Sequence, residues 1–193
     1  MISRQPSGVY AMAVPADDWP ENRQTCVDVL CGYLRMPYEP DPGGEAALAD
    51  RAAYRANREV RHTIIRLIGA HLREGALASW QGLNLDLTGV VFDGGDFRGA
   101  EFTGGEVRFD KAQFTAGQLG FRDTRFIGGL VSFRDAEFTG GTVDFRQVAV
   151  WKNAPEFDWD STPPPGVSLP VQPVTRPPDG ASAAAGTSTP TGS

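Results

Sequence analysis

The sequence predicts an α+β chain in which an N-terminal helical region caps a stacked-coil β-helix and a disordered tail follows. Three observations predict it: apolar residues at helical spacing in residues 1–80, an aromatic repeat in residues 81–151, and prolines scattered among Ser, Thr, Ala and Gly in residues 152–193. The first pattern is typical of helices, the second of a repeat architecture, and the third of a segment that cannot bury a core.

The first helix is expected to begin at the segment DDWPE, residues 17–21. Acidic residues and a proline favour the first turn of a helix, and the Met-Pro pair at 36–37 favours its end. A loop of sequence YEPDPGGE, residues 38–45, follows. The apolar positions of this helix recur at helical spacing: Cys26, Val27, Val29, Leu30, Tyr33 and Leu34.

A second helix is best defined over residues 57–73, and residues 46–56 can extend it backwards. Gly75 is a suitable stop after its last turn. One apolar stripe runs along it, made of Val60, Ile64, Leu67, Ile68, His71 and Leu72. Four arginines are expected mainly on its other faces, namely Arg58, Arg61, Arg66 and Arg73.

The middle of the chain carries a strict aromatic repeat. Leu87, Phe92, Phe97 and Phe102 are spaced by five residues, and the phenylalanines then alternate between intervals of seven and five up to Phe145. The resulting 12-residue unit is visible in EFTGGEVRFDKAQ, QFTAGQLGFRDTR, RFIGGLVSFRDAE and EFTGGTVDFRQVA. Such internal repeats predict an architecture in which each unit stacks on the next. An ordinary sandwich of hairpins is the alternative, but hairpins rarely keep strict phase over so many units.

Each phenylalanine is preceded, two positions earlier, by a small or apolar residue. Because side chains on a strand alternate between faces, both residues of such a pair point inward. These partners are Ala100, Val107, Ala112, Leu119, Thr124, Val131, Ala136 and Val143. The two extra residues of each longer interval are mostly glycine, as in Gly104-Gly105 and Gly128-Gly129. Glycine permits the positive φ of a sharp corner, so the chain should run straight, turn, and coil onto itself.

The stretch GVVFDGGDFRGAEFTGG, with an aromatic or leucine at every fifth position and Ala or Gly two residues before it, resembles the pentapeptide-repeat proteins. This resemblance implies a right-handed, four-sided β-helix. The GG-expanded unit is similar to an actinobacterial variant, and SGVYAM, WPENRQTCVDVLCGYLRMPY and REVRHTIIRLIGAHLR resemble the helical region before its repeats. Longer relatives carry membrane-spanning segments upstream, and this chain starts in what resembles the middle of their helical region. The resemblance spans residues 8–150 and indicates fold more than function.

The coil can close in two ways. Four sides of five, seven, five and seven residues would give a 24-residue turn that stacks Phe97 on Phe121 and Phe145. A narrow coil would close every 12 residues and stack Phe97 on Phe109. Two phenylalanines in every 12-residue turn would crowd a narrow lumen, so we predict the wide coil. It places Arg98, Arg122 and Arg146 in one outward file.

The ends of the coil need covers, because an open end exposes apolar core and backbone edges. We expect the helical region to cover the first coil, with Trp80 as a plug between helix and coil. Trp151, Phe157 and Trp159 are expected to cover the other end, and anchoring to a partner is their alternative role.

Composition excludes several functions. The net charge of −6, and ten acidic against seven basic residues in 83–150, argue against direct nucleic-acid binding. The only lysines, Lys111 and Lys152, indicate a GC-rich bacterial genome. Without ~18 consecutive apolar residues or a signal-peptide core, the chain is expected in the cytoplasm, at a membrane only through a partner.

No enzyme, cofactor site or metal site is predicted. His62 and His71 have no Ser, Cys or paired carboxylate at a spacing that completes a triad or a metal site. Cys26 and Cys31 would point about 140° apart on a helix, so two buried, reduced cysteines are expected. No Gly-rich loop precedes the Lys-Ser/Thr pair of a nucleotide site.

The leading functional prediction is a protein-binding or scaffolding module, because a β-helix offers regular outward columns of side chains. Arg98, Arg122 and Arg146 are the candidate partner-facing surface. The alternative is a DNA-mimicking, topoisomerase-binding protein, which some pentapeptide-repeat proteins are, although the mixed charges here are less one-sided than a mimic requires. Ice binding would need ranks of outward threonine, and Ile127 interrupts the file of Thr103, Thr115 and Thr139.

Overall fold

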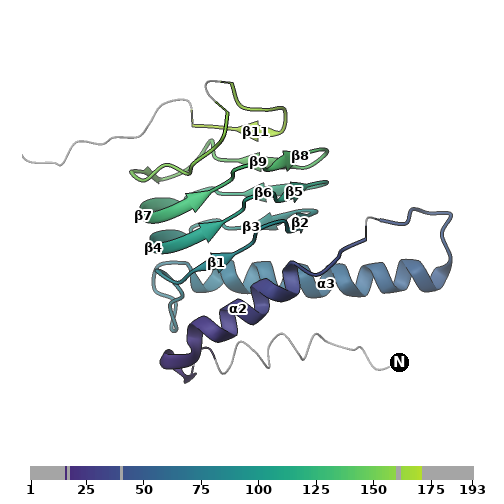
Figure 1. Ribbon diagram of the computed structural model, residues 1–193, viewed down its shortest axis with the longest axis horizontal. Helices are drawn as coiled ribbons and strands as arrows, with labels where there is room; N and C mark the ends of the chain where they lie inside the picture. The colour runs from purple at the N-terminus through teal and green to yellow at the C-terminus, as the bar shows by residue number, and fades with distance from the viewer. Residues whose placement is uncertain (1–15, 17, 40, 160–161, 171–193) are drawn as a thin grey trace, which may run out of the picture.

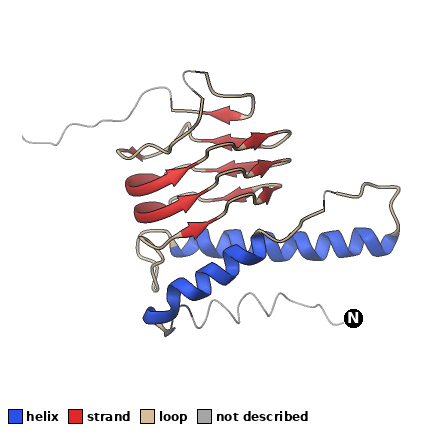
Figure 2. Ribbon diagram, viewed as in Figure 1, coloured by secondary structure: helices blue, strands red, loops and turns tan. Residues whose placement is uncertain are grey.

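The computed structural model describes residues 16, 18–39, 41–159 and 162–170. It consists of short N-terminal helices followed by a parallel β-solenoid, as predicted. Figure 1 shows the helices at one end of a stack of strands in which β1, β4 and β7 lie one above another. Figure 2 separates the two parts by colour, with blue helices beneath red strands.

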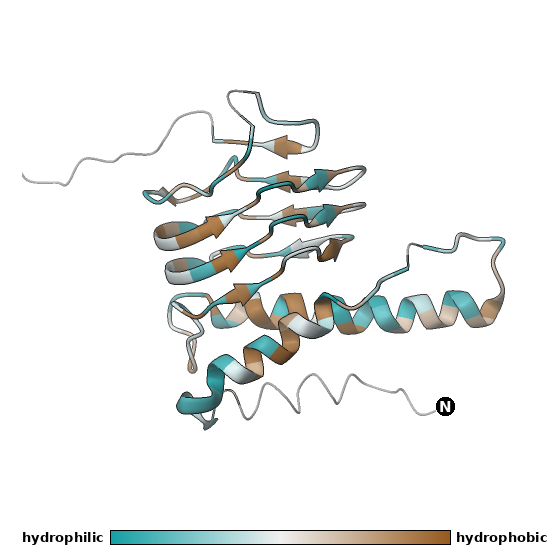
Figure 3. Cartoon of the chain, in the orientation of Figure 1, coloured by the Kyte–Doolittle hydropathy of each residue, from teal (hydrophilic) through white to brown (hydrophobic). Residues whose placement is uncertain are grey.

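The helices follow the predicted pattern. A short 3-10 helix η1 (Pro20–Asn22) leads into α2 (Arg23–Leu34), and α3 (Leu48–His71) follows the loop. α3 includes the predicted backward extension, and its N-terminal part projects beyond the coil (Figure 1). In Figure 3 the brown turns of α3 lie mainly where it runs beneath the coil, which is where its side chains are buried.

The helices cover the first coil through an apolar layer. α2 packs against β1 and α3 packs against β3. Trp80 is fully buried between helix and coil, its backbone N–H donates to the His71 carbonyl at 3.0 Å, and its ring stacks on His71 with centroids 4.1 Å apart. The predicted capping role of the helices and of Trp80 is confirmed. The buried apolar residues of α2 and of the end of α3 are Val27, Leu30, Cys31, Leu34, Ile64, Ile65, Ile68 and Leu72.

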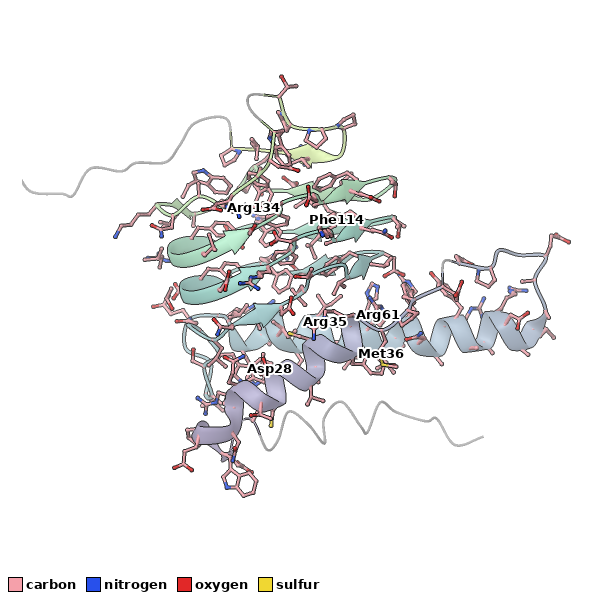
Figure 4. The ribbon with its side chains drawn as sticks, viewed as in Figure 1. Asp28, Arg35, Met36, Arg61, Phe114 and Arg134 are labelled. Atoms are coloured by element: carbon pink, nitrogen blue, oxygen red, sulfur yellow. The ribbon has the colours of Figure 1, made fainter. Side chains whose placement is uncertain are left out.

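Arg61 departs from the prediction that the arginines of α3 lie on its outer faces. It is 2% exposed, and its guanidinium donates to the Leu34 carbonyl at 2.7 Å and to the Val91 carbonyl at 2.8 Å. It also lies over the Tyr38 ring, 4.3 Å from the centroid. Figure 4 labels Arg61 at the junction of the helices and the coil. A buried arginine thus joins α2, α3 and the first coil.

All strand pairs of the solenoid are parallel, which excludes the hairpin alternative for the described residues. Three sheets run along it, in the orders β1-β4-β7-β10, β11-β9-β6-β3 and β2-β5-β8. The strands are β1 (Leu85–Asp86), β2 (Val91–Phe92), β3 (Gly95–Asp96), β4 (Glu101–Arg108), β5 (Gln113–Phe114), β6 (Gln118–Gly120), β7 (Arg125–Ser132), β8 (Glu137–Phe138), β9 (Thr142–Asp144), β10 (Val150–Trp151) and β11 (Val167–Ser168).

The register confirms the wide coil. Phe102 pairs with Phe126 and Phe114 pairs with Phe138, so the turns in the middle of the coil take 24 residues. The first turn is shorter, because Phe92 pairs with Phe114, 22 residues later. It lacks one two-residue extension, since Phe92 and Phe97 are only five residues apart.

Four columns of aromatic rings fill the core. Neighbouring phenylalanines within a column stack with centroids 4.5 to 5.5 Å apart. Rings from different columns meet edge to face, as Phe97 and Phe109 do at 5.9 Å across the core. The columns are Phe92-Phe114-Phe138, Phe97-Phe121-Phe145, Phe102-Phe126 and Phe109-Phe133-Phe157.

A second kind of corner follows the inward phenylalanines and was not predicted. Lys111, Asp123 and Asp135 have φ values of 56°, 57° and 55°, each two residues after a phenylalanine. The residue after each of them donates its N–H to that phenylalanine's carbonyl, as Ala112 does to Phe109 at 3.1 Å. These tight turns need a left-handed backbone conformation at their third residue, and here non-glycine residues adopt that conformation.

The coil continues past residue 151, so the expected boundary of the tail is placed too early. β11 pairs with β9, and Glu156 forms a parallel bridge with Ser132. Trp151, Phe157 and Trp159 pack against the core, which confirms the predicted cover. The prolines of 163–165 lie in the loop before β11 and leave its short pairing intact. Residues 160–161 and 171–193 of the predicted tail lie outside the described residues.

Candidate partner-binding surface

The structure places the three predicted arginines in one file. Arg98, Arg122 and Arg146 each follow a phenylalanine of one column and are exposed on consecutive coils. The register of the flanking strands fixes the file, because Asp96 pairs with Gly120 and Gly120 pairs with Asp144. Parallel neighbours lie about 4.8 Å apart, so the backbone presents the three side chains as a ladder.

The three arginines of this file differ in their pairing with nearby carboxylates. Arg146 forms a bidentate pair with Asp144 at 2.9 and 2.7 Å, and the hydrogen bond from Arg146 lowers the pKa of that carboxyl below its usual value. Arg122 reaches Asp123 at 3.4 Å, with both side chains well exposed. Arg98 forms no ion pair within the described part of the chain. The guanidinium of Arg146 is therefore held by a carboxylate, whereas those of Arg98 and Arg122 remain more available to a partner.

A groove of about 210 Å³ is lined by two arginines of the file, Arg98 and Arg122. Its polar lining offers guanidinium and amide donors, together with two carboxylates. Gln118 donates to Asp144 at 3.1 Å and so holds one carboxylate in place. The lining residues are Asp96, Arg98, Gln118, Gly120, Arg122, Asp144 and Gln147.

A second polar cluster, not predicted from the sequence, surrounds Asp93 on the first coil. Its carboxylate accepts hydrogen bonds from Tyr38 at 2.8 Å and Arg58 at 2.7 Å, lies 2.6 Å from His62 Nε2, and is 10% exposed. Burial raises the pKa of Asp93, but the bonds from His62, Tyr38 and Arg58 outweigh it and hold the pKa below its usual range. The cluster ties α3 and the α2–α3 loop to the coil.

One signal in the sequence could have pointed to this cluster. Asp93 follows Phe92, and the equivalent positions on the later coils hold Thr115 and Thr139. The only break in this column therefore falls on the coil that contacts the helices. The imidazole of His62 is paired with the Asp93 carboxylate, and Nδ1 of His71 lies 2.8 Å from the Leu67 carbonyl oxygen.

The cysteines differ in burial. Cys31 is buried as predicted, and burial raises the pKa of its thiol to about 12, whereas Cys26 is only half-buried. Both thiols are free. Within the described ranges, no group of three or more His, Cys, Asp or Glu side chains is arranged to hold a metal ion. The same residues include no helix with the length and apolar character needed to cross a membrane.

The other outer columns show mixed charge. Glu101 pairs with Arg125 at 3.0 Å, and Asp110 accepts the backbone N–H of Arg134 at 3.0 Å. Arg134 (Figure 4) also pairs with Glu156 at 2.6 Å. Glu101 and Glu156 are thus compensated by arginines, whereas Asp110 accepts hydrogen bonds from a backbone N–H and from the Ser132 hydroxyl.

Comparisons with known proteins give no relative: no family model, no curated protein and no solved structure matches this chain. The β-solenoid fold is therefore identified by the register of its strands and by its phenylalanine columns. Its outer surfaces have to be interpreted from their own chemistry.

Proposed function

We propose that this chain is a non-enzymatic protein-binding or scaffolding module of the pentapeptide-repeat type, with Arg98, Arg122 and Arg146 as its partner-facing surface. The observation that carries the proposal is the file itself: three exposed arginines held in register by a continuous parallel ladder. Such a ladder loses little conformational freedom at the backbone on binding, which favours recognition. The free cysteines support a reducing compartment such as the cytoplasm.

The chemistry of the file favours an acidic protein surface as the partner. Guanidinium groups pair bidentately with carboxylates, and Arg98 and Arg122 have capacity left for such pairs. The rival function, a DNA mimic, requires a surface of predominantly negative charge. Arg125 and Arg134 interrupt the acidic columns at Glu101 and Glu156, so the rival has less support.

The test is quantitative cross-linking and affinity capture from the native host with two matched variants. Arg98→Gln/Arg122→Gln/Arg146→Gln removes the file, and Arg108→Gln/Arg125→Gln/Arg134→Gln removes the same charge from other columns. We expect one captured protein to be lost with the first variant and kept with the second. Equal capture by both variants would show that the file is not the binding surface. Inhibition of topoisomerase supercoiling by the chain would support the DNA-mimic function instead.

A further inference from the structure

We infer that a groove between the α2–α3 loop and the projecting part of α3 binds an arginine-bearing extended segment of a partner protein. The groove has a volume of about 510 Å³, within the range of ligand sites. It lies away from the arginine file, on elements the proposed function does not use (Figure 1). Its lining residues are Pro37, Tyr38, Glu39, Asp41, Pro42, Asp50, Ala53, Tyr54 and Asn57.

The floor of the groove is aromatic. Tyr38 and Tyr54 stack with centroids 5.9 Å apart and an interplanar angle of 20°. Both also line an adjoining cavity of about 430 Å³ against the coil, beside Gln113 and Thr115. The tyrosine pair therefore offers apolar contact to a segment that runs from α3 toward the coil.

The charge of the groove is of one sign. Among the described residues, Glu39, Asp41 and Asp50 line it, and no Lys, Arg or His does. None of the three carboxylates forms an ion pair within the described residues. Asp41 uses one oxygen to accept the Gly43 N–H at 2.9 Å. Three carboxylates that form no ion pair within the described residues, beside two stacked tyrosine rings, are complementary to a cation with an apolar, planar body.

Arginine fits this description better than lysine. Its planar guanidinium stacks on aromatic rings and pairs bidentately with carboxylates, whereas the lysine ammonium is a compact, strongly hydrated charge. The protein already shows the first contact, since the Arg61 guanidinium lies over the Tyr38 ring at 4.3 Å. Arg51 and Arg55 line a smaller cavity that shares Asp41 and Tyr54 with the groove, so Asp41 also faces these two arginines, whereas Glu39 and Asp50 line the groove alone.

The inference is tested by calorimetric titration of acetyl-tetra-arginine amide and acetyl-tetra-lysine amide at low ionic strength. Glu39→Gln/Asp41→Asn/Asp50→Asn removes the charge of the groove. Asp123→Asn/Asp135→Asn/Glu137→Gln removes the same charge from exposed positions on the coil. We expect the first variant to weaken tetra-arginine binding at least about tenfold, and the second to leave it within about twofold.

Tyr54 provides an independent test of the aromatic floor. Tyr54→Leu should weaken tetra-arginine binding about two- to fivefold and leave tetra-lysine binding unchanged, while Tyr54→Phe keeps the ring and the affinity. Equal weakening by the two charge variants would mean a general attraction to a negatively charged protein and would overturn the inference. So would absence of binding by the unmodified chain, or equal affinity for both peptides. The variant that lacks the arginine file should bind tetra-arginine at least as tightly as the unmodified chain. Failure of this inference can therefore be told apart from failure of the proposed function.

Discussion

Phe97 stacks on Phe121 with ring centroids 5.5 Å apart, although a whole turn of the coil separates them in the chain. Phe121 in turn stacks on Phe145 at 4.7 Å. Each ring of this column is almost entirely buried, and Phe121, in the middle, stacks on an equivalent ring on both sides. The stability of the solenoid therefore depends on columns of identical side chains in strict register.

Replacing Phe121 with Ala should destabilise the protein by about 3–5 kcal/mol, because it opens a cavity in the middle of a column. Arg122→Ala, one residue later and exposed, should change the free energy of unfolding by no more than about 0.5 kcal/mol. Thermal and urea unfolding of both variants measure the difference. Comparable losses would contradict the assignment of Phe121 to the inside and Arg122 to the outside.

The sequence predicted the columns because both the repeat and the alternation of faces are local properties. Phe97, Phe121 and Trp80 could be placed inside without any knowledge of how distant segments pack. The left-handed corners at Lys111, Asp123 and Asp135 were missed, because no glycine marks them. The repeat itself contained the signal, since each follows its phenylalanine by two positions.

The features that were missed depend on how separate elements dock. Arg61 was expected outside because arginines line other faces of α3, yet the rotation of the helix against the coil aims it at two carbonyl groups. The Asp93 cluster joins residues from three segments, and only the substitution of Asp for Thr in one column hinted at it. The strand β11 (Val167–Ser168) was hidden by the proline-rich composition around it.

The corner glycines should differ in a measurable way. Gly89 and Gly129 both have positive φ, at 68° and 72°. A Cβ on Gly89 would meet nothing within 4 Å, whereas one on Gly129 would lie 2.6 Å from the backbone of Gly104 on the coil below. We expect Gly89→Ala to destabilise the protein by about 1–2 kcal/mol, because the alanine backbone is strained at positive φ. Gly129→Ala should destabilise it by about 3–4 kcal/mol, because crowding against the neighbouring coil is added to that strain. Equal melting temperatures for the two variants would argue against close stacking of the corners.

Arg61→Met should cost about 2–4 kcal/mol, because the carbonyl groups of Leu34 and Val91 would lose their donor in a buried position. Arg66→Met is the control, since Arg66 is exposed and its one hydrogen bond among the described residues goes to the Thr63 hydroxyl, at 3.1 Å. Its effect should stay within about 0.5 kcal/mol. Urea unfolding measures both. A loss for Arg61→Met no larger than that for Arg66→Met would show that Arg61 is not needed to join the helices to the coil.

The Asp93 cluster should make the free energy of unfolding depend on pH in the acidic range. The pKa of Asp93 is held below its usual range, so its ionised form stabilises the fold at any pH above the usual Asp pKa of about 3.9. This contribution is lost as the pH falls from there toward the lowered pKa of the folded state.

Asp93→Asn should therefore destabilise the protein by about 1–3 kcal/mol at neutral pH, where it removes charged hydrogen bonds from Arg58 and Tyr38. The difference from the unmodified chain should shrink when urea unfolding is repeated at about pH 3, because Asp93 of the unfolded chain is then protonated and its advantage in the folded state is smaller. Asp123→Asn, at an exposed position, should show little difference at either pH. If the loss caused by Asp93→Asn were the same at both pH values, the carboxylate would not be the group that ties α3 to the coil.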